Sequence, residues 1–371
     1  MNVIVIFTYG ISLKDWDEAG ILDREIKFYK KMSNKYNINY SFITFGTKDD
    51  EMYVQDLEEI NVYPVYEFIK FSNNKFLNLF KSLLIPFKLK NLLTENQIIK
   101  TNQLNGAWIG IILKKLLKIP LFTRTGYNLY EFSLNNKKPF LVKLFHYLLT
   151  QIALFSSDLY TVTSIADKSF LQGKFNKTKA IKIIPNWIEK LSHNNFSNRY
   201  ENKILTVGRL EKQKNIDGLI KLMEGSRIEI DIVGEGSEKN SLMKLSEKLN
   251  VKINFKGKLN FHDLNNIYKD YRIFILPSLF EGNPKALLEA MGSGCLVIAA
   301  NNKNIQEIIR NNENGILFNP EDNLKQIIEY FLNNTEESEK IIQKSYQSIE
   351  DNNLIENIME SEIYYYKNLI K

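Results

Sequence analysis

The chain has 371 residues, 44% hydrophobic and 25% charged, which is typical of a globular protein long enough for two domains. Its net charge of +6 is mildly basic and fits a phosphorylated ligand, an anionic membrane surface or nucleic acid. The single cysteine, Cys295, excludes an intramolecular disulfide, and His146, His193 and His262 have no metal-ligand spacing. We expect a cytoplasmic protein, because no signal peptide and no run of roughly 20 apolar residues is recognisable.

Short apolar runs alternate with amphipathic stretches in the first half of the chain. We expect strands at 3–7, 40–45, 97–101, 120–125, 159–164 and 181–185. Helical periodicity appears between them at 21–32, 106–117, 139–155 and 165–172. This alternation predicts a mostly parallel sheet with helices on both faces, in a first domain of residues 1–185. The polar stretch 186–202 is predicted to be a linker.

The same alternation restarts after the linker and predicts a second α/β domain over 203–344. We expect strands at 203–208, 228–234, 251–257, 272–278, 295–300 and 315–318. We expect helices at 215–224, 237–249, 262–270, 284–292, 304–310 and 322–333, and a helical end at 336–371. Because ligands of doubly wound sheets bind at the carboxyl ends of the strands, a site is predicted there.

The stretch LFEGNPKALLEAMGSG, 279–294, predicts an anion site at the start of a helix. Asn283 is a good N-cap, and Pro284 suits the first helical position. Gly282 leaves the backbone open to a ligand, and the N–H groups from Lys285 onward lie at the positive end of the helix dipole. Phosphate is the anion that this arrangement favours.

Two glutamates flank that anion site. Glu281 lies in the loop before the helix, and Glu289 lies more than one turn inside it. One carboxylate on each side of a phosphate suits a ligand with hydroxyls at both ends of a diphosphate, as in a nucleotide-sugar. The alternative is that Glu281 is an ordinary loop charge and Glu289 a solvated helix residue.

A basic loop follows the first strand of the second domain. The stretch TVGRLEKQKN places Gly208, Arg209 and Lys214 at the carboxyl end of that strand. Arginine offers a planar fork for phosphate oxygens and lysine a mobile point charge, so together they can neutralise a departing diphosphate. A merely solvated loop is the alternative.

The motifs of the second domain, in order, resemble a known family. GRLEKQKNIDGLI, VGEGSE, FKGKL, ILPSLFEGNPKALLEAMGSG and NENGILF are similar to the second domain of retaining glycosyltransferases of family 4. The resemblance covers 203–330 and implies the α/β GT-B fold, with two Rossmann-like doubly wound domains facing a central cleft. It also implies that a helix at 345–371 crosses back to the first domain.

The resemblance implies roles for residues of the second domain. Arg209 and Lys214 would hold the donor diphosphate, with Glu281 on the sugar hydroxyls and Glu289 on the ribose. The backbone of Gly282, Asn283, Pro284 and Lys285 would lie beside sugar and phosphate. The loops around Gly234 and around Gly257 and Leu259 would approach base and diphosphate, and Gly208 is a further donor-binding candidate.

The first domain resembles the family more loosely. Gly10, a donor-binding candidate, stands where the family often has two glycines. Arg124, Gly126 and Tyr127 occupy a loop in which many members carry a histidine that meets the sugar, so they become acceptor-side candidates. These departures leave the donor sugar open.

The predicted chemistry needs neither metal nor cofactor. Asp15 and Asp17 have Asp-x-Asp spacing but lie in the first loop or helix start, and we expect no metal site there. No Ser-His or Cys-His pair suggests a covalent nucleophile. Electrostatic stabilisation of the leaving group is therefore the expected catalytic device. The resemblance implies retention at the anomeric carbon, with the leaving phosphate accepting the acceptor's proton.

Two basic amphipathic stretches, 75–93 and 137–149, resemble segments that lie in a membrane interface. If either stretch faces lipid, the predicted acceptor is a lipid-linked saccharide. Ordinary helices packed on the first sheet are the alternative. The hypothesis is transfer from a UDP-sugar, in preference to a GDP-sugar, to a saccharide or lipid-linked saccharide in bacterial surface polysaccharide synthesis. The anionic inner membrane surface is a proposed partner and nucleic acid is not. The rival functions are a nucleotide-sugar epimerase and a non-catalytic scaffold.

Overall fold

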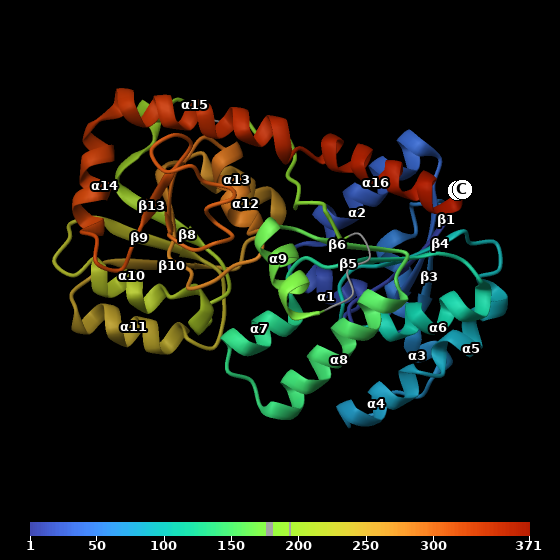
Figure 1. Cartoon of the computed structure of the whole chain (residues 1–371). Helices are drawn as coiled ribbons and strands as arrows, with labels where there is room; N and C mark the ends of the chain where they lie inside the picture. The colour runs from blue at the N-terminus through green and yellow to red at the C-terminus, as the bar shows by residue number, and fades with distance from the viewer. Residues whose placement is uncertain (176–180, 193) are drawn as a thin grey trace. The chain divides into compact units, whose positions relative to one another are not determined.

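The computed structural model describes residues 1–175, 181–192 and 194–371 (Figure 1). His193, within the predicted linker, lies outside the described residues. The chain forms two compact units. Unit 1 comprises Met1–Ile184 with Met359–Lys371, and unit 2 comprises Pro185–Ile358.

Unit 1 is built on a seven-stranded parallel sheet of order β3-β2-β1-β4-β5-β6-β7. The strands are β1 (Asn2–Ile6), β2 (Asn39–Thr44), β3 (Ile60–Pro64), β4 (Ile98–Thr101), β5 (Leu121–Arg124), β6 (Leu159–Val162) and β7 (Ile181–Ile183). Its helices are α1 (Leu13–Glu18), α2 (Leu22–Tyr36), α3 (Val65–Phe68), α4 (Lys75–Ser82), α5 (Ile85–Leu89), α6 (Ala107–Leu117), α7 (Leu129–Asn135), α8 (Phe140–Ser156), α9 (Ile165–Lys174) and the greater part of α16 (Ile355–Ile370). Two 3-10 helices, η1 (Lys48–Val54) and η2 (Lys90–Leu92), complete it.

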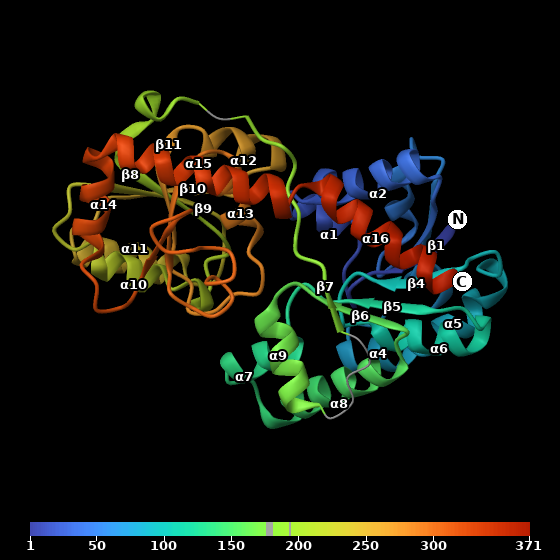
Figure 2. The ribbon, with the colours of Figure 1, turned by 45° about the horizontal axis from the view of Figure 1, so that its top comes forward.

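The apolar strands of unit 1 are buried on both faces, as a parallel sheet between helix layers requires. Helices α5, α6 and α8 pack on one face, against residues such as Ile6 and Ile99. Helices α2 and α16 lie on the other face (Figure 2). On that face the ring of Tyr366 packs against that of Phe122. The two faces alternate along each strand, so Ile99 and Lys100 of β4 belong to different layers.

Unit 2 contains a six-stranded parallel sheet of order β10-β9-β8-β11-β12-β13. The strands are β8 (Tyr200–Val207), β9 (Glu229–Val233), β10 (Ile253–Gly257), β11 (Tyr271–Leu276), β12 (Leu296–Ala300) and β13 (Ile316–Phe318). The helices are η3 (Phe196–Asn198), η4 (Lys212–Lys214), α10 (Ile216–Leu222), α11 (Lys239–Lys248), α12 (Phe261–Tyr268), α13 (Lys285–Gly292), α14 (Leu324–Asn333) and α15 (Thr335–Asn352). Helices α10, α11 and α14 cover one face of this sheet, and α12 and α13 cover the other.

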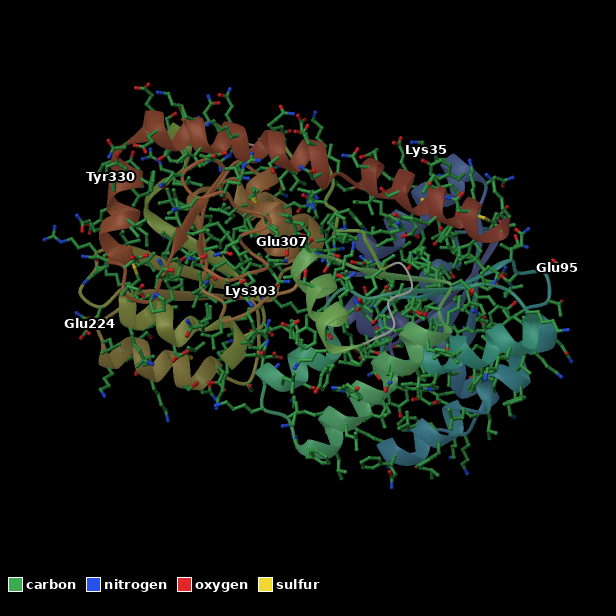
Figure 3. The ribbon with its side chains drawn as sticks, in the orientation of Figure 1. Lys35, Glu95, Glu224, Lys303, Glu307 and Tyr330 are labelled. Carbon is green, nitrogen blue, oxygen red and sulfur yellow. The ribbon has the colours of Figure 1, made fainter. Side chains whose placement is uncertain are left out.

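Two expected helices are wrong in detail. The predicted helix at 304–310 is a chain of turns, in which the backbone N–H of Ile305 donates to the Asn302 carbonyl and that of Ile308 to the Ile305 carbonyl. The turns span 303–308 and carry the labelled Lys303 and Glu307, whereas Tyr330 lies on the regular helix α14 (Figure 3). The stretch 336–371 forms two helices, because α15 ends at Asn352 and α16 begins at Ile355.

Candidate active site

Three glycines lie at the carboxyl ends of the adjacent strands β8, β9 and β10, since Gly208 and Gly234 follow β8 and β9 and Gly257 ends β10. Gly208 donates its N–H to the Val233 carbonyl at 3.0 Å, and Gly234 donates to the Gly257 carbonyl at 2.7 Å. Gly234 has φ +139°, and a Cβ there would lie 2.0 Å from the Gly208 carbonyl oxygen. Only glycine fits that position, so this edge of the sheet presents bare backbone on which a planar or phosphorylated group can lie.

The loop after β8 is tied to the loop after β11. The backbone N–H of Leu279 donates to the Gln213 carbonyl at 2.9 Å, and Gln213 Nε2 donates to the Phe280 carbonyl at 2.8 Å. Asn215 Nδ2 donates to the Pro277 carbonyl at 3.1 Å. These contacts join the predicted basic loop and the predicted glutamate loop in one local structure.

That structure brings Lys214 and Glu281 together. Lys214 Nζ lies 2.5 Å from Glu281 Oε1, and only 16% and 7% of the two side chains are exposed. The methylene chain of Lys214 also fills the space beside Gly208, where a Cβ would lie 3.1 Å from Lys214 Cε. We call the carboxyl ends of β8, β9 and β10, with Gly208, Gly234 and Gly257, the glycine edge. The partly buried Lys214 cation therefore lies beside Gly208 at the glycine edge, where the Glu281 carboxylate holds it.

Arg209 is arranged differently. Its side chain is 72% exposed, and Nη1 lies 3.0 Å from Glu211 Oε1 in the same loop. An exposed pair of this kind is weak, so the guanidinium can turn towards an anion at little cost. Arg209 supplies a mobile charge next to the fixed charge of Lys214.

The start of α13 differs from the prediction. Pro284, not Asn283, occupies the N-cap, and the Pro284 carbonyl accepts the N–H groups of Leu287 and Leu288. Asn283 is buried and serves a different purpose: its Oδ1 accepts the backbone N–H of Asn186 at 2.9 Å. Asn186 Nδ2 in turn donates to the Asn283 carbonyl at 2.6 Å. The prediction of an N-cap at Asn283 was therefore wrong, because Asn186, in the segment after β7, binds the side chain and carbonyl of Asn283 instead.

The rest of the α13 region is closely packed. Glu289, predicted to be reachable by a ligand, is 2% exposed, and its Oε2 accepts the hydroxyl of Tyr268 at 3.3 Å. Lys285 Nζ lies 4.2 Å from the centre of the Trp187 ring, which is within cation–π distance. Gly282 is also buried. Leu259 packs against the core layer under α12 and α13.

Four predicted residues lie in unit 1, at the carboxyl edge of the seven-stranded sheet. Gly10 is exposed, with φ +77° and no heavy atom near a Cβ. Gly126 donates its N–H to Gln103 Oε1 at 2.7 Å, and the Tyr127 ring packs against Phe132. Arg124, at the end of β5, is half-buried.

The arrangement in unit 2 suits the binding and release of a diphosphate. A fixed lysine, a mobile arginine and the amino end of α13 belong to loops joined by hydrogen bonds, and the first turn of a helix lacks acceptors for its N–H groups. The Glu281 carboxylate can accept hydroxyl hydrogens. Gln213, Asn215 and Asn186 were missed from the sequence, since single amide residues in loops carry no periodic signal.

The two parallel sheets of seven and six strands make up the GT-B fold. Residues 188–348 match the family model of glycosyl transferases group 1. This match agrees with the resemblance found in the sequence and supports a nucleotide-sugar-dependent glycosyltransferase.

Similar proteins span nearly the whole chain. An uncharacterized glycosyltransferase of Haemophilus influenzae is 26% identical over 337 residues, which is 88% of this chain and 90% of that protein. Sucrose-phosphate synthase from Thermosynechococcus elongatus has a TM-score of 0.82 at 16% identity, covering 100% of this chain and 99% of that one. HepE from Anabaena, solved with UDP and glucose, has a TM-score of 0.78 at 15% identity, covering 99% and 100%.

Proposed function

We propose that the protein transfers a sugar, with retention at the anomeric carbon, from a UDP-sugar to a saccharide or lipid-linked saccharide. The setting would be bacterial surface polysaccharide synthesis (capsule, O-antigen or lipopolysaccharide) at the inner face of the cytoplasmic membrane. In this proposal unit 2 binds the donor and unit 1 binds the acceptor. The observation that carries it is the pairing of Lys214 with Glu281 beside the glycine edge.

The pairing gives each partner a role in the proposed reaction. When the bond between the sugar C1 and the diphosphate oxygen breaks, negative charge grows on the diphosphate. Lys214 is already fixed, so no reorganisation is needed to stabilise that charge, and Arg209 adds a second cation. The acceptor oxygen forms the new bond to C1, and its proton passes to the departing diphosphate. Glu281 would hold the sugar hydroxyls meanwhile.

In the proposed function, the Glu289 carboxylate binds the ribose of the donor, which requires that the carboxylate is held in position. The carboxylate is buried and already accepts one hydroxyl from Tyr268, so it is held in place before a ligand arrives. Hydroxyls of a ribose diol are hydrogen-bond donors that a carboxylate accepts. UDP is preferred as the nucleotide because HepE, a protein of the same fold, was solved with it.

UDP release separates the proposed function from its rivals. The candidate donors are UDP-glucose, UDP-galactose, UDP-N-acetylglucosamine and GDP-mannose. We expect the protein to release UDP from one of the UDP-sugars. Adding a saccharide or lipid extract of bacterial membranes should raise the rate of that release. A labelled sugar should appear on a component of that extract. Conversion of the sugar without an acceptor would instead support an epimerase, and the absence of any turnover would support a scaffold.

A further inference from the structure

Unit 1 carries a large apolar surface on helices α4, α5 and α8. Of the 24 large hydrophobic side chains exposed among the described residues, 16 lie in the two segments 68–94 and 132–157. Phe76, Phe80, Phe140 and Leu141 are between 66% and 76% exposed. Monomeric proteins rarely expose so many neighbouring large apolar groups without using them for binding.

Helix α8 shows why this surface is not part of the core. Its buried residues, which include Leu149, Ala153 and Leu154, form the side that packs on unit 1. A second apolar stripe at helical spacing remains outside, at Leu141, Leu144, Leu148, Ile152 and Phe155. A helix that only covers a sheet would be polar on that outer side.

The exposed groups of α4 and α8 belong to one surface. Trp108 of α6 connects the two helices, because its Nε1 donates to Ser82 Oγ at 2.9 Å and its ring lies 6.3 Å from that of Phe145. Helices α4 and α8 lie side by side in both ribbon views (Figures 1 and 2). We call this surface, with its apolar residues in 68–94 and 132–157, the aromatic face.

The charged side chains in the two segments that carry the aromatic face, 68–94 and 132–157, are all positive. The two segments contain eight lysines, and none of the 43 Asp and Glu residues of the chain. Since the chain has 49 Lys and Arg, the remaining residues carry 41 basic and 43 acidic groups, so the whole positive excess of the protein comes from these segments. A second copy on this face would set lysines against lysines, whereas an anionic partner would be attracted.

We propose that the aromatic face docks on an anionic lipid bilayer, with its Phe and Leu side chains in the interface and its lysines on the lipid phosphates. Within the described part of the chain, no helix is long and apolar enough to cross a bilayer. Apolar groups combined with lysines are the features of helices that lie in the plane of a membrane.

The face adjoins the carboxyl ends of the strands of unit 1, where the predicted acceptor-side residues Arg124, Gly126 and Tyr127 also lie. The hydroxyl of Tyr9, in the loop after β1, donates to the Lys75 carbonyl at the start of α4 at 2.8 Å. Gly10 follows in the same loop. The inference thus deepens the proposed function and rests on it for one point, namely that the membrane supplies a lipid-linked acceptor to this edge.

Co-sedimentation of the full-length chain with vesicles tests the inference. We expect binding to phosphatidylglycerol–phosphatidylethanolamine vesicles that weakens with added salt, and little binding to phosphatidylcholine. Phe76→Ser with Phe80→Ser should lower the partition coefficient at least about tenfold, because both rings leave the interface. Lys75→Glu with Lys88→Glu should lower it at least about 25-fold, since each lysine near such a surface contributes about fivefold.

Matched variants on α11 of unit 2 are the controls. Met243→Ser and Lys244→Glu with Lys248→Glu should leave vesicle binding unchanged. A wild-type protein that stays in the supernatant, or patch variants that bind as well as wild type, would overturn the inference. The inference would also be overturned if the wild-type protein formed dimers without vesicles and the Phe76→Ser, Phe80→Ser variant were monomeric. Vesicle binding needs no donor, so intact binding without UDP release contradicts only the proposed sugar transfer. UDP release without vesicle binding contradicts the membrane inference and the proposed membrane setting, but not the sugar transfer.

Discussion

Replacing Lys214 by alanine is expected to lower kcat by about 10²- to 10³-fold, as expected for the loss of one fixed charge that stabilises a transition state. Lys214 lies beside the bare glycine backbone at the end of β8 and is oriented by Glu281 at 2.5 Å. Without the Lys214 amino group, only the mobile Arg209 cation is left to stabilise the departing diphosphate. The effect should appear mainly in kcat, because the charge matters most when the diphosphate leaves. Steady-state UDP release measures it.

The control for Lys214 is its neighbour Lys212, which is exposed on the same 3-10 turn. Lys212→Ala should leave kcat nearly unchanged. Lys214→Ala also leaves the buried Glu281 carboxylate without its cation and should cost about 1–3 kcal/mol of stability, so activity is compared below the unfolding transition of both proteins. Equal activity of folded Lys214→Ala and wild type would remove Lys214 from the proposed catalytic device.

Replacing Lys100 by methionine is expected to destabilise unit 1 by about 3–5 kcal/mol, because it leaves a buried charge without its partner. Lys100 of β4 pairs with Glu362 of α16, with 3% and 1% of the side chains exposed, and Tyr366 donates its hydroxyl to the same carboxylate. The rings of Phe28 and Tyr29 lie 5.3 and 5.4 Å from Lys100 Nζ. Burial lowers the pKa of Lys100, and the charge of Glu362 opposes that shift. Urea unfolding measures the loss.

A second substitution separates the buried charge from the packing. Lys100→Met with Glu362→Gln should recover most of the lost stability, since the glutamine carbonyl can still accept the Tyr366 hydroxyl and no charge remains buried. Lys340→Ala, which removes an exposed partner of Glu336 on α15, should cause no measurable change. If Lys100→Met were as harmless as Lys340→Ala, the pair would not hold residues 359–371 on unit 1.

Most of the fold could be predicted because its signals are local. Runs such as VIVIF and RIFILPS are apolar enough to mark buried parallel strands, and β1 and β11 form there. The glycines at 208, 234 and 257 could be predicted to end strands, but their contact across three strands required the sheet order. The roles of Arg209, Lys214, Glu281 and Glu289 in the reaction stay predictions, although the structure joins the loops that carry Lys214 and Glu281.

The features that could not be predicted depend on contacts distant in the chain. Asn283 is a good N-cap by local rules, yet Asn186, 97 positions away, takes its side-chain oxygen. Ile305 and Ile309 have helical spacing, but both are buried while the preceding asparagines favour turns. The buried pair of Lys100 could not be predicted either, because its partner Glu362 is 262 residues away.

The central claim is that unit 2 holds the diphosphate of a nucleotide-sugar, and thermal unfolding with UDP, GDP and ADP tests it most directly. A nucleotide at about 100 times its Kd adds roughly 2.7 kcal/mol of stability, which gives a visible rise in Tm. We expect UDP to raise the Tm of the wild type, GDP and ADP to raise it less, and Arg209→Ala to reduce the UDP shift. If none of the three nucleotides shifts the Tm of the wild-type protein, the donor site is contradicted.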